Sequence, residues 1–367
     1  MPFPTPSANQ RIVVIGAGVV GLTVALETRR RGYEVVIIAD RIAPEITSVV
    51  AGALWEWPPA VCGHHRDPTS LERSKHWAAA SYQIFADLAL DPRTGVHVRP
   101  TVFYFRRPLA EIPFEHSKMR ELAENVRGFR HDVALAAEHD IASDAEVQDA
   151  YTHLAPMIDT EHYLRWLQRE VLAAGCQIVR DRVVGPLAER EGELLRKFGS
   201  QAIVNCSGLG AAQLVPDHRV YPLRGSLIHV RNDGTDMPPI TTAHCMSFDE
   251  SFGAQNMVFI VPRGRNRLVL GGLVQPGEWE TDVTLDDPDV RQMMERCRAF
   301  LPVLRHARPI ADQPCRTGLR PARHGNVRLE LESDTSIVHC YGHGGSGVTF
   351  SWGSAAEVAD ILDKITQ

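Results

Sequence analysis

A glycine-rich turn near the N-terminus constrains the fold of this chain more than any other stretch. The apolar residues 12–15 predict a short buried strand. Three glycines follow in the spacing G-x-G-x-x-G, namely Gly16, Gly18 and Gly21. Apolar residues then recur with helical period as far as Gly32, and a second buried strand over 35–39 ends at Asp40. This order predicts a β-α-β unit that binds a dinucleotide.

Each part of this unit has a physical role in such binding. Gly16 permits a tight turn, Gly18 lets a pyrophosphate approach bare backbone, and Gly21 lets helix and strand pack closely. The helix start offers free N–H groups and a positive dipole end to the phosphates. Asp40 can accept the ribose hydroxyls. NAD and FAD both fit this unit, and a purely structural β-α-β unit is the remaining alternative.

Composition bounds the class of protein. The 367 residues suffice for a large core and two domains, and the 44% hydrophobic and 23% charged content is that of a soluble globular protein. A net charge of −6 argues against nucleic acid or an anionic membrane as partner. The seven cysteines show no C-x-x-C spacing, which favours a reducing compartment without disulfides or metal. With neither a signal peptide nor a membrane-length apolar run, we expect a cytoplasmic protein.

Elsewhere the chain alternates between helical and strand patterns. Helices are predicted over 70–90, 161–175, 288–301 and 351–365. Strands are predicted over 96–100, 101–105, 176–179, 201–205, 226–230, 258–261, 268–270 and 337–340. The segment 109–155 is charged and helix-prone. His64 and His65 lack ligand-spaced carboxylates or cysteines, so a solvated loop is a better interpretation than a metal site.

These patterns predict an α/β fold with a Rossmann-like domain and a second domain built on a mostly antiparallel sheet. Both domains are expected to be discontinuous. The nucleotide-binding domain would comprise 1–57, 150–215 and 306–367, and the substrate-binding domain 58–149 and 216–305. A second glycine cluster over 342–349 lies at the start of a predicted helix and forms a second candidate anion-binding site. The small residues over 47–55 fit either a flat ligand or a close-packed loop.

Taken together, the motifs resemble the D-amino-acid oxidase family of FAD-dependent amine oxidases along nearly the whole chain. The N-terminal unit and Ala51-Gly52-Ala53-Leu54-Trp55 look like its FAD-binding segment. Its middle motifs resemble residues 162–167, 204–208 and 223–225. The most family-specific matches are 270–272 with Trp279, Arg316-Thr317-Gly318-Leu319-Arg320-Pro321, and the glycine run from Tyr341 to Thr349.

This resemblance implies FAD as the cofactor and a placement for it. The residues implied at its ADP half are Gly16, Ala17, Gly18, Val19, Val20, Gly21, Asp40 and Arg41, with Val183 at the adenosine end. Those implied on the flavin side are Thr47, Ser48, Ala51, Gly52, Ala53 and Leu54. Further contacts are implied for Ser207, Gly208, Arg320, Gly344, Gly345, Ser346, Gly347, Val348 and Thr349. The helix start in this last run would stabilise negative charge on the pyrimidine edge of the flavin.

The resemblance also implies how substrate is held. Arg320 would make a two-pronged salt link to the substrate carboxylate, the alternative being a structural arginine paired with a surface acid. The carbonyl of Gly345 would orient the substrate amine. A hydride would pass from Cα to the flavin, no side chain need act as a base, and the imine would hydrolyse in water. The implied products are an imino acid, then a 2-oxo acid and ammonia, and hydrogen peroxide.

Three positions depart from the family pattern. Gln255 and Phe259 stand where two tyrosines near the substrate are typical, and Ser346 replaces a further tyrosine. The loss of these hydroxyls should weaken carboxylate binding by about 1 kcal/mol per hydrogen bond. Glu56 could favour a basic substrate group or be a solvated loop carboxylate.

The expected function is therefore an FAD oxidase of amino acids, with D-amino acids the favoured substrates and molecular oxygen the acceptor. One alternative is a relative that oxidises glycine, a secondary amine or a specialised metabolite. The other is a flavin-binding protein with little turnover. No nucleic acid, membrane or metal is expected as a partner, and a homodimer is possible.

Overall fold

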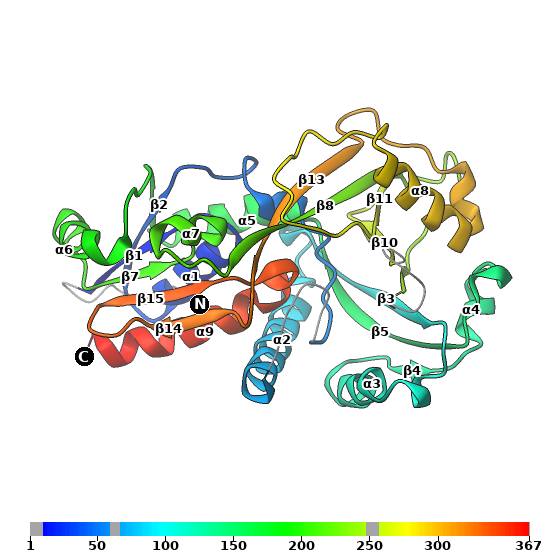
Figure 1. Cartoon of the computed structure of the whole chain (residues 1–367), viewed down its shortest axis with the longest axis horizontal. Helices are drawn as coiled ribbons and strands as arrows, with labels where there is room; N and C mark the ends of the chain where they lie inside the picture. Colours follow the sequence, from blue (N-terminus) through cyan, green and yellow to red (C-terminus); the bar gives the residue numbers. More distant parts are fainter. Residues whose placement is uncertain (1–9, 59–66, 247–256, 367) are drawn as a thin grey trace.

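The computed structural model describes residues 10–58, 67–246 and 257–366, and these form two sheets with helices around them (Figure 1). In Figure 1 the first sheet lies on the left and the second on the right. The α-helices are α1 (Val19–Arg30), α2 (Pro68–Leu88), α3 (Pro113–Asn125), α4 (Leu135–Glu138), α5 (Thr160–Ala173), α6 (Leu187–Phe198), α7 (Ala211–Leu214), α8 (Pro288–Phe300) and α9 (Gly347–Ile365). Short 3-10 helices are η1 (Thr47–Val50), η2 (Pro92–Thr94), η3 (Leu109–Glu111), η4 (Ser143–Ala145), η5 (Gly208–Gly210), η7 (Pro302–His306) and η8 (Gly344–Ser346).

The first sheet is Rossmann-like, as the sequence predicts. Its strand order is β14-β15-β7-β1-β2-β6, and every pair is parallel except β14 with β15. The carboxyl ends of the parallel strands therefore meet at one edge, where an open α/β sheet binds its ligands. The strands are β1 (Arg11–Ile15), β2 (Glu34–Ala39), β6 (Gln177–Arg180), β7 (Ala202–Asn205), β14 (Arg328–Leu331) and β15 (Ile337–Tyr341).

The second sheet is mostly antiparallel and is also confirmed. Its order is β12-β8-β11-β10-β9-β3-β5-β4, with β13 paired to β8 and only β3 and β9 running parallel. Its strands are β3 (Val96–Phe105), β4 (Arg130–His131), β5 (Asp149–Ile158), β8 (Val220–Arg231), β9 (Ala243–Met246), β10 (Val258–Arg263), β11 (Arg267–Gly271), β12 (Gln275–Pro276) and β13 (Cys315–Arg323). The long pair β8 and β13 reaches from this sheet toward the first (Figure 1).

Helix α9 packs against both α1 and α2 beside the first sheet. The contact with α2 requires a glycine, because a Cβ on Gly353 would lie 2.3 Å from Cα of Trp77. The indole N–H of Trp352 reaches the hydroxyl of Tyr163 in α5 at 3.0 Å. These contacts fix the start of α9, and with it the second glycine run, against the edge of the sheet.

Several elements differ from the sequence-based expectations. The predicted strands 96–100 and 101–105 form one strand, β3, and Pro100 lies where β3 pairs with β5 alone, before the residues 101–104 that also pair with β9. Such an edge position tolerates proline, which has no N–H to donate to a second neighbour. The charged segment 109–155 contains α3 and α4 but ends in β5, which pairs with β3 along its full length. Strands β13 and β14 and helix α6 lie where no element is predicted, and α9 begins at Gly347 rather than near 351. Tertiary pairing outweighs local composition at these places.

The domain boundaries remain a prediction. Strand β5 lies in the second sheet although 150–215 is predicted for the nucleotide-binding domain. Strand β13 also lies in the second sheet, within the predicted range 306–367. Both strands carry the chain between the two sheets, so a boundary drawn on sequence alone cuts through shared elements.

Candidate active site

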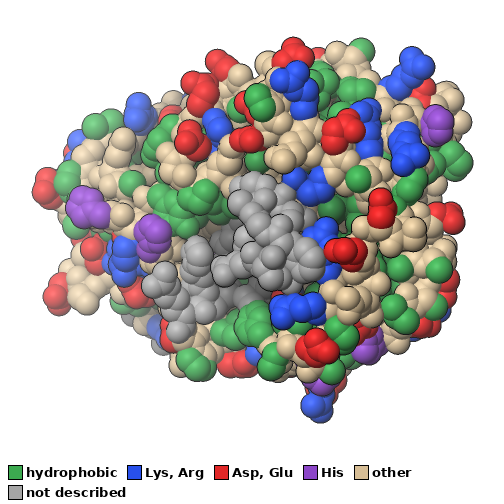
Figure 2. Space-filling model, turned by 45° about the vertical axis from the view of Figure 1, so that its right-hand side comes forward, with side chains coloured by type: hydrophobic (Ala, Val, Ile, Leu, Met, Phe, Trp, Pro, Cys, Tyr) green, Lys and Arg blue, Asp and Glu red, His purple; other side chains and the backbone are tan. Residues whose placement is uncertain are grey.

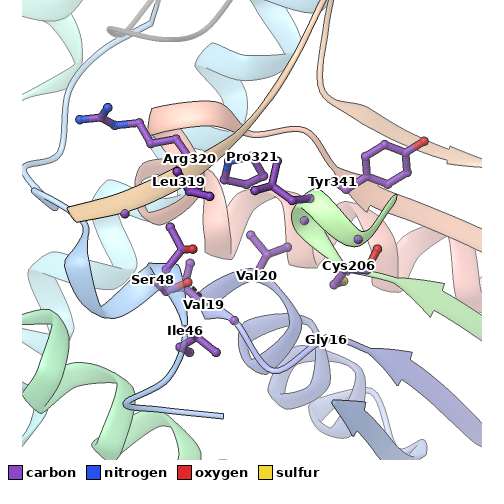
Figure 3. Close-up of a pocket in the computed structure, with 18 of the residues that line it drawn as sticks. Gly16, Val19, Val20, Ile46, Ser48, Cys206, Leu319, Arg320, Pro321 and Tyr341 are labelled. Atoms are coloured by element: carbon purple, nitrogen blue, oxygen red, sulfur yellow. Dashed lines mark hydrogen bonds between the residues drawn. The ribbon is translucent and has the colours of Figure 1, made fainter. Parts of the chain in front are cut away.

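A cavity of about 810 Å³ runs between the carboxyl edge of the first sheet and the pair β8 and β13. It brings together residues that the sequence holds up to about three hundred positions apart, as Gly16 and Arg320 illustrate (Figure 3). The predicted cofactor residues that line it are Gly16, Ala17, Gly18, Val19, Val20, Asp40, Arg41, Thr47, Ser48, Ala51, Gly52, Ala53, Leu54, Val183, Ser207, Gly208, Arg320, Gly344, Gly345, Gly347, Val348 and Thr349. Gly21, Ser346 and Phe259 are not among its lining residues.

The first glycine turn is tightly built. Gly16 has φ +107°, and a Cβ there would lie 2.5 Å from the carbonyl oxygen of Cys206. A Cβ on Gly21 would lie 2.0 Å from the carbonyl oxygen of Gly16. Gly21 thus lets helix α1 and strand β1 pack closely, while the bare backbone from Gly16 to Gly18 faces the cavity.

The start of α1 is held by a residue from another segment. Gly18, the N-cap, offers no side chain, and the N–H of Val19 donates instead to the hydroxyl of Ser48 at 3.0 Å (Figure 3). The sequence assigns Ser48 only to the flavin side, so its capping contact is a finding of the structure. The cap ties η1 to the glycine turn, so two segments that line the cavity are joined at the start of α1.

The far end of the cavity carries the acid that the motif predicts. Asp40 is exposed directly after β2, and its carboxylate has no partner in the described parts of the chain. Asp181 and Arg182, which follow β6, line the same end. The sequence analysis missed these two residues, although their place directly after the predicted strand 176–179 could have indicated them.

Arg320 enters the opposite end of the cavity from β13. Its guanidinium lies over Gly225 of β8, where a Cβ would come within 2.1 Å of a terminal nitrogen of the arginine. One nitrogen donates to the carbonyl of Arg224 at 3.3 Å. No carboxylate among residues 10–58, 67–246 and 257–366 forms an ion pair with it. In the described protein this arginine is therefore not the structural partner of a surface acid.

The second glycine run closes the cavity. Strand β15 ends at Tyr341, Gly344 has φ +55°, and α9 begins at Gly347. Gly345 is exposed toward the cavity, which gives its backbone access to a ligand. Ser346 is 1% exposed, and its hydroxyl has no hydrogen-bond partner among the described residues. It is not among the residues that line the cavity.

Two thiols and an imidazole at this edge escaped the sequence analysis. Cys206 follows β7 and Cys340 ends the neighbouring strand β15, so the parallel register brings them side by side. The hydrogen bond with Cys206 lowers the pKa of Cys340 against the effect of burial, and His343 adds to this, whereas burial raises the pKa of Cys206. The Sγ of Cys340 lies 4.0 Å from Nε2 of His343. All three line the cavity.

The residues that depart from the family pattern lie in different parts of the chain. Phe259 in β10 packs its half-buried ring over Gly52 and Gly271, where Cβ atoms would approach it to 2.9 and 3.1 Å. Gln255 lies outside the described residues, as do His64 and His65.

The suggested substrate role of Glu56 is not supported, because its carboxylate binds Nζ of the buried Lys118 at 2.8 Å. Burial alone lowers the pKa of Lys118, but the charges of Glu56 and Glu115 outweigh it and raise the pKa. Glu56 is therefore the partly buried partner of a buried lysine and not a solvated loop carboxylate.

The described residues offer few other sites. None of their helices has the length and apolarity needed to cross a bilayer. Among them no three His, Cys, Asp or Glu side chains gather closely enough to hold a metal ion. Acidic and basic side chains alternate over the face that Figure 2 shows.

Comparisons with known proteins agree with this site. The family described as FAD dependent oxidoreductase matches residues 11–361. A D-amino-acid oxidase of Rubrobacter xylanophilus is 36% identical over 356 residues, covering 96% of this chain and 95% of the relative. A D-aspartate oxidase of Homo sapiens is 30% identical over 96% of this chain and 95% of the relative. Glycine oxidase from Geobacillus kaustophilus shares the fold with a TM-score of 0.76 at 18% identity, over 97% of this chain and 95% of that one.

The chain belongs to the FAD-dependent oxidoreductase family. It is a D-amino-acid oxidase-like flavoenzyme, as the sequence resemblance implies, and its cofactor is FAD.

The cavity fits this cofactor. The helix start at Val19 and the exposed Asp40 suit a pyrophosphate and a ribose, and the N–H groups of Gly52 and Ala53 donate to no residue in the described parts of the chain. When FAD is bound there, the first glycine turn would hold its pyrophosphate and the second would lie at its flavin end.

Proposed function

We propose that this flavoenzyme oxidises the CH–NH2 bond of a D-amino acid with oxygen as acceptor, giving an imino acid and hydrogen peroxide. The observation that carries the proposal is the guanidinium of Arg320, which lies in the cavity without a carboxylate partner among the described residues. A guanidinium binds a carboxylate through two parallel hydrogen bonds, so this one suits the carboxylate of an amino acid. The names of the relatives support the same substrate class.

The chain contributes binding and orientation. Arg320 would hold the substrate carboxylate, and the carbonyl oxygen of Gly345, an exposed residue that lines the cavity, would accept a hydrogen bond from the amine. These two contacts fix the direction of the Cα–H bond. Bound FAD supplies the acceptor for the hydride and passes the electrons to oxygen. The imine then leaves and hydrolyses in water to a 2-oxo acid and ammonia, so no side chain need remove a proton from Cα.

The proposal is tested by anaerobic reduction of the holoenzyme, followed by the loss of the visible flavin absorption. D-amino acids should bleach the flavin, whereas their L-enantiomers should not, because the two contacts would aim a different bond at the cofactor. Admission of oxygen should then restore the absorption and release hydrogen peroxide. A flavin that none of the D-amino acids bleaches would overturn the assignment.

A second candidate is oxidation of glycine or a secondary amine. Phe259 lacks the hydroxyl that the family typically offers to the carboxylate, and Ser346 is buried away from the cavity. A substrate held by fewer hydrogen bonds would suit such a site. Bleaching by glycine or an N-methyl amino acid, without bleaching by larger D-amino acids, would favour this candidate.

Replacement of Arg320 tests how the carboxylate is bound. Arg320→Ala removes both charged hydrogen bonds, each contributing about 1.5–3 kcal/mol, so the KM for amino acids should rise about a hundredfold or more. FAD should remain bound, because the two glycine turns that would hold it are untouched. Steady-state kinetics and the flavin content of the purified variant measure both effects. An unchanged KM would mean that another group binds the carboxylate.

A further inference from the structure

Arg263, at the end of β10, is a buried cation whose role the proposed reaction leaves open. It is 3% exposed, and its guanidinium donates to the carbonyls of Ala51 and Gly52 at 2.9 and 2.8 Å and to the hydroxyl of Thr160 at 2.8 Å. It forms no ion pair with a carboxylate in the described residues. Burial lowers the pKa of Arg263 to about 10, so the group remains charged at neutral pH.

Because Arg263 binds the carbonyls of Ala51 and Gly52, it also sets the direction of the N–H groups in the same two peptide units. The N–H of a trans peptide is directed away from its carbonyl, and the described peptide bonds here are trans. The N–H groups of Gly52 and Ala53 therefore point away from Arg263. Gly52 and Ala53 line the cavity, and their N–H groups donate to no described residue. They are preorganised donors without an acceptor among residues 10–58, 67–246 and 257–366.

Contacts with other parts of the protein stabilise the backbone conformation of residues 51–53. Ala53 has φ +50°, a left-handed conformation that is unfavourable for a residue with a side chain. Its carbonyl accepts from the N–H of Ile158 at 3.0 Å, and the ring of Phe259 packs over Gly52. Together with the fork of Arg263, these contacts hold the segment in one arrangement.

We propose that Arg263 is a positioning residue for the flavin. Its guanidinium fixes Ala51 and Gly52 so that the N–H groups of Gly52 and Ala53 are aimed at bound FAD. Its charge also polarises the two peptide groups in the same direction, which favours the more negative, reduced form of the cofactor. This role concerns FAD alone and holds whichever amine is the substrate, so it does not depend on the proposed substrate.

A purely structural arginine would tie the two sheets together and do nothing else, and Arg267 provides the matched control. Arg267 is a half-buried neighbour on β11, where its guanidinium lies 3.3 Å from Asp159 and 3.2 Å from Glu161. It is not among the residues lining the cavity and makes no hydrogen bond to residues 51–53. Loss of Arg267 should lower stability without altering the flavin.

The experiment compares wild-type holoenzyme with Arg263→Gln, Arg263→Lys and Arg267→Gln. The dissociation constant of FAD and the two-electron reduction potential of the bound flavin are measured for each, without substrate. Both Arg263 variants should bind FAD about tenfold more weakly, because neither can hold Thr160 with one nitrogen while a second nitrogen binds both carbonyls. In Arg263→Gln the affinity for reduced over oxidised flavin should also fall about tenfold, a potential about 30 mV more negative. Arg263→Lys keeps the charge and should keep the potential.

Arg267→Gln should match the wild type in both FAD affinity and potential while melting at a lower temperature. The proposal is overturned if Arg263→Gln retains the wild-type potential, or if Arg267→Gln shifts it equally. If Arg263→Gln does not fold, Arg263→Lys decides, and wild-type FAD affinity in that variant rejects the positioning role. Failure of D-amino acids to reduce the flavin would leave these readouts unaffected, so the two proposals fail separately.

Discussion

Phe259 allows a test, at the residue scale, of how much one hydroxyl would add to substrate affinity. Its Cζ atom, which would carry a hydroxyl in tyrosine, lies beside Gly52, and the backbone of Gly52 lines the cavity. Phe259→Tyr should bind small D-amino acids about fivefold more tightly, since one hydrogen bond contributes about 1 kcal/mol. The KM and the binding of a non-reacting carboxylate measure the gain. Weaker or unchanged binding would mean that position 259 does not face the substrate.

Gly225 is a second residue whose effect can be measured. A Cβ at this position would come within 2.1 Å of the guanidinium of Arg320, so Gly225→Ala should push that side chain out of its present place. We expect the KM for amino acids to rise about tenfold, with FAD still bound. Steady-state kinetics test this, and turnover of an amine without a carboxylate serves as the control. A KM equal to that of the wild type would show that the arginine relocates without loss.

At the scale of elements, the contact of α9 with α2 controls the position of the second glycine run. A Cβ on Gly353 would lie 2.3 Å from Cα and 2.5 Å from the carbonyl oxygen of Trp77. Because these are backbone atoms, the helices must separate, and Gly353→Ala should lower the free energy of unfolding by about 2 kcal/mol. Urea denaturation of the holoenzyme measures the loss.

Gly192 in α6 is the matched control for this substitution. A Cβ there would meet only the mobile end of Arg196, at 3.2 Å. Gly192→Ala should therefore leave stability unchanged or raise it by up to about 1 kcal/mol through helix propensity. Equal destabilisation by both substitutions would show that helix packing is not the cause.

At the scale of the whole molecule, buried histidines make stability depend on pH. Burial lowers the pKa of His153 and His339 to about 4 and that of His229 and His244 to about 3, from 6.5. The unfolded chain binds these protons first. The stability that the neutral rings contribute is therefore complete above pH 6.5 and is lost as the pH falls toward 4.

His153→Phe isolates one such contribution. The ring of His153 stacks on Phe103 at 5.8 Å, so phenylalanine should fill its place, and the carbonyl of Leu154 keeps its bond from Tyr82 at 2.9 Å. Between pH 6.5 and 4 the wild type should lose up to about 1.4 kcal/mol per pH unit through this residue, and the variant should lose less by that amount. Urea midpoints at several pH values measure the slopes. Parallel slopes would contradict the assignment of His153 as a buried neutral group.

The sequence predicted some elements well and others poorly, for physical reasons. The β-α-β unit from Arg11 to Ala39 follows from local patterning. Its strands are buried on both faces and so read as apolar runs, and its glycines occupy fixed positions within one short turn. Strand β5 escaped prediction because its neighbours are charged, and only its pairing with β3 makes it a strand. Strand β13 likewise depends on β8, which lies about ninety residues earlier.

By itself, the sequence determined the Rossmann-like start, the family, FAD as cofactor and Arg320 as the residue proposed for the carboxylate. These depend on short motifs whose chemistry is local. Only the tertiary structure placed Ser48 on the start of α1, paired Glu56 with Lys118, and set the buried Arg263 behind residues 51 and 52. Each of these contacts joins segments at least 29 positions apart, where the partner is chosen by packing and by the need to satisfy buried polar groups. These partners therefore cannot be predicted from a local sequence pattern.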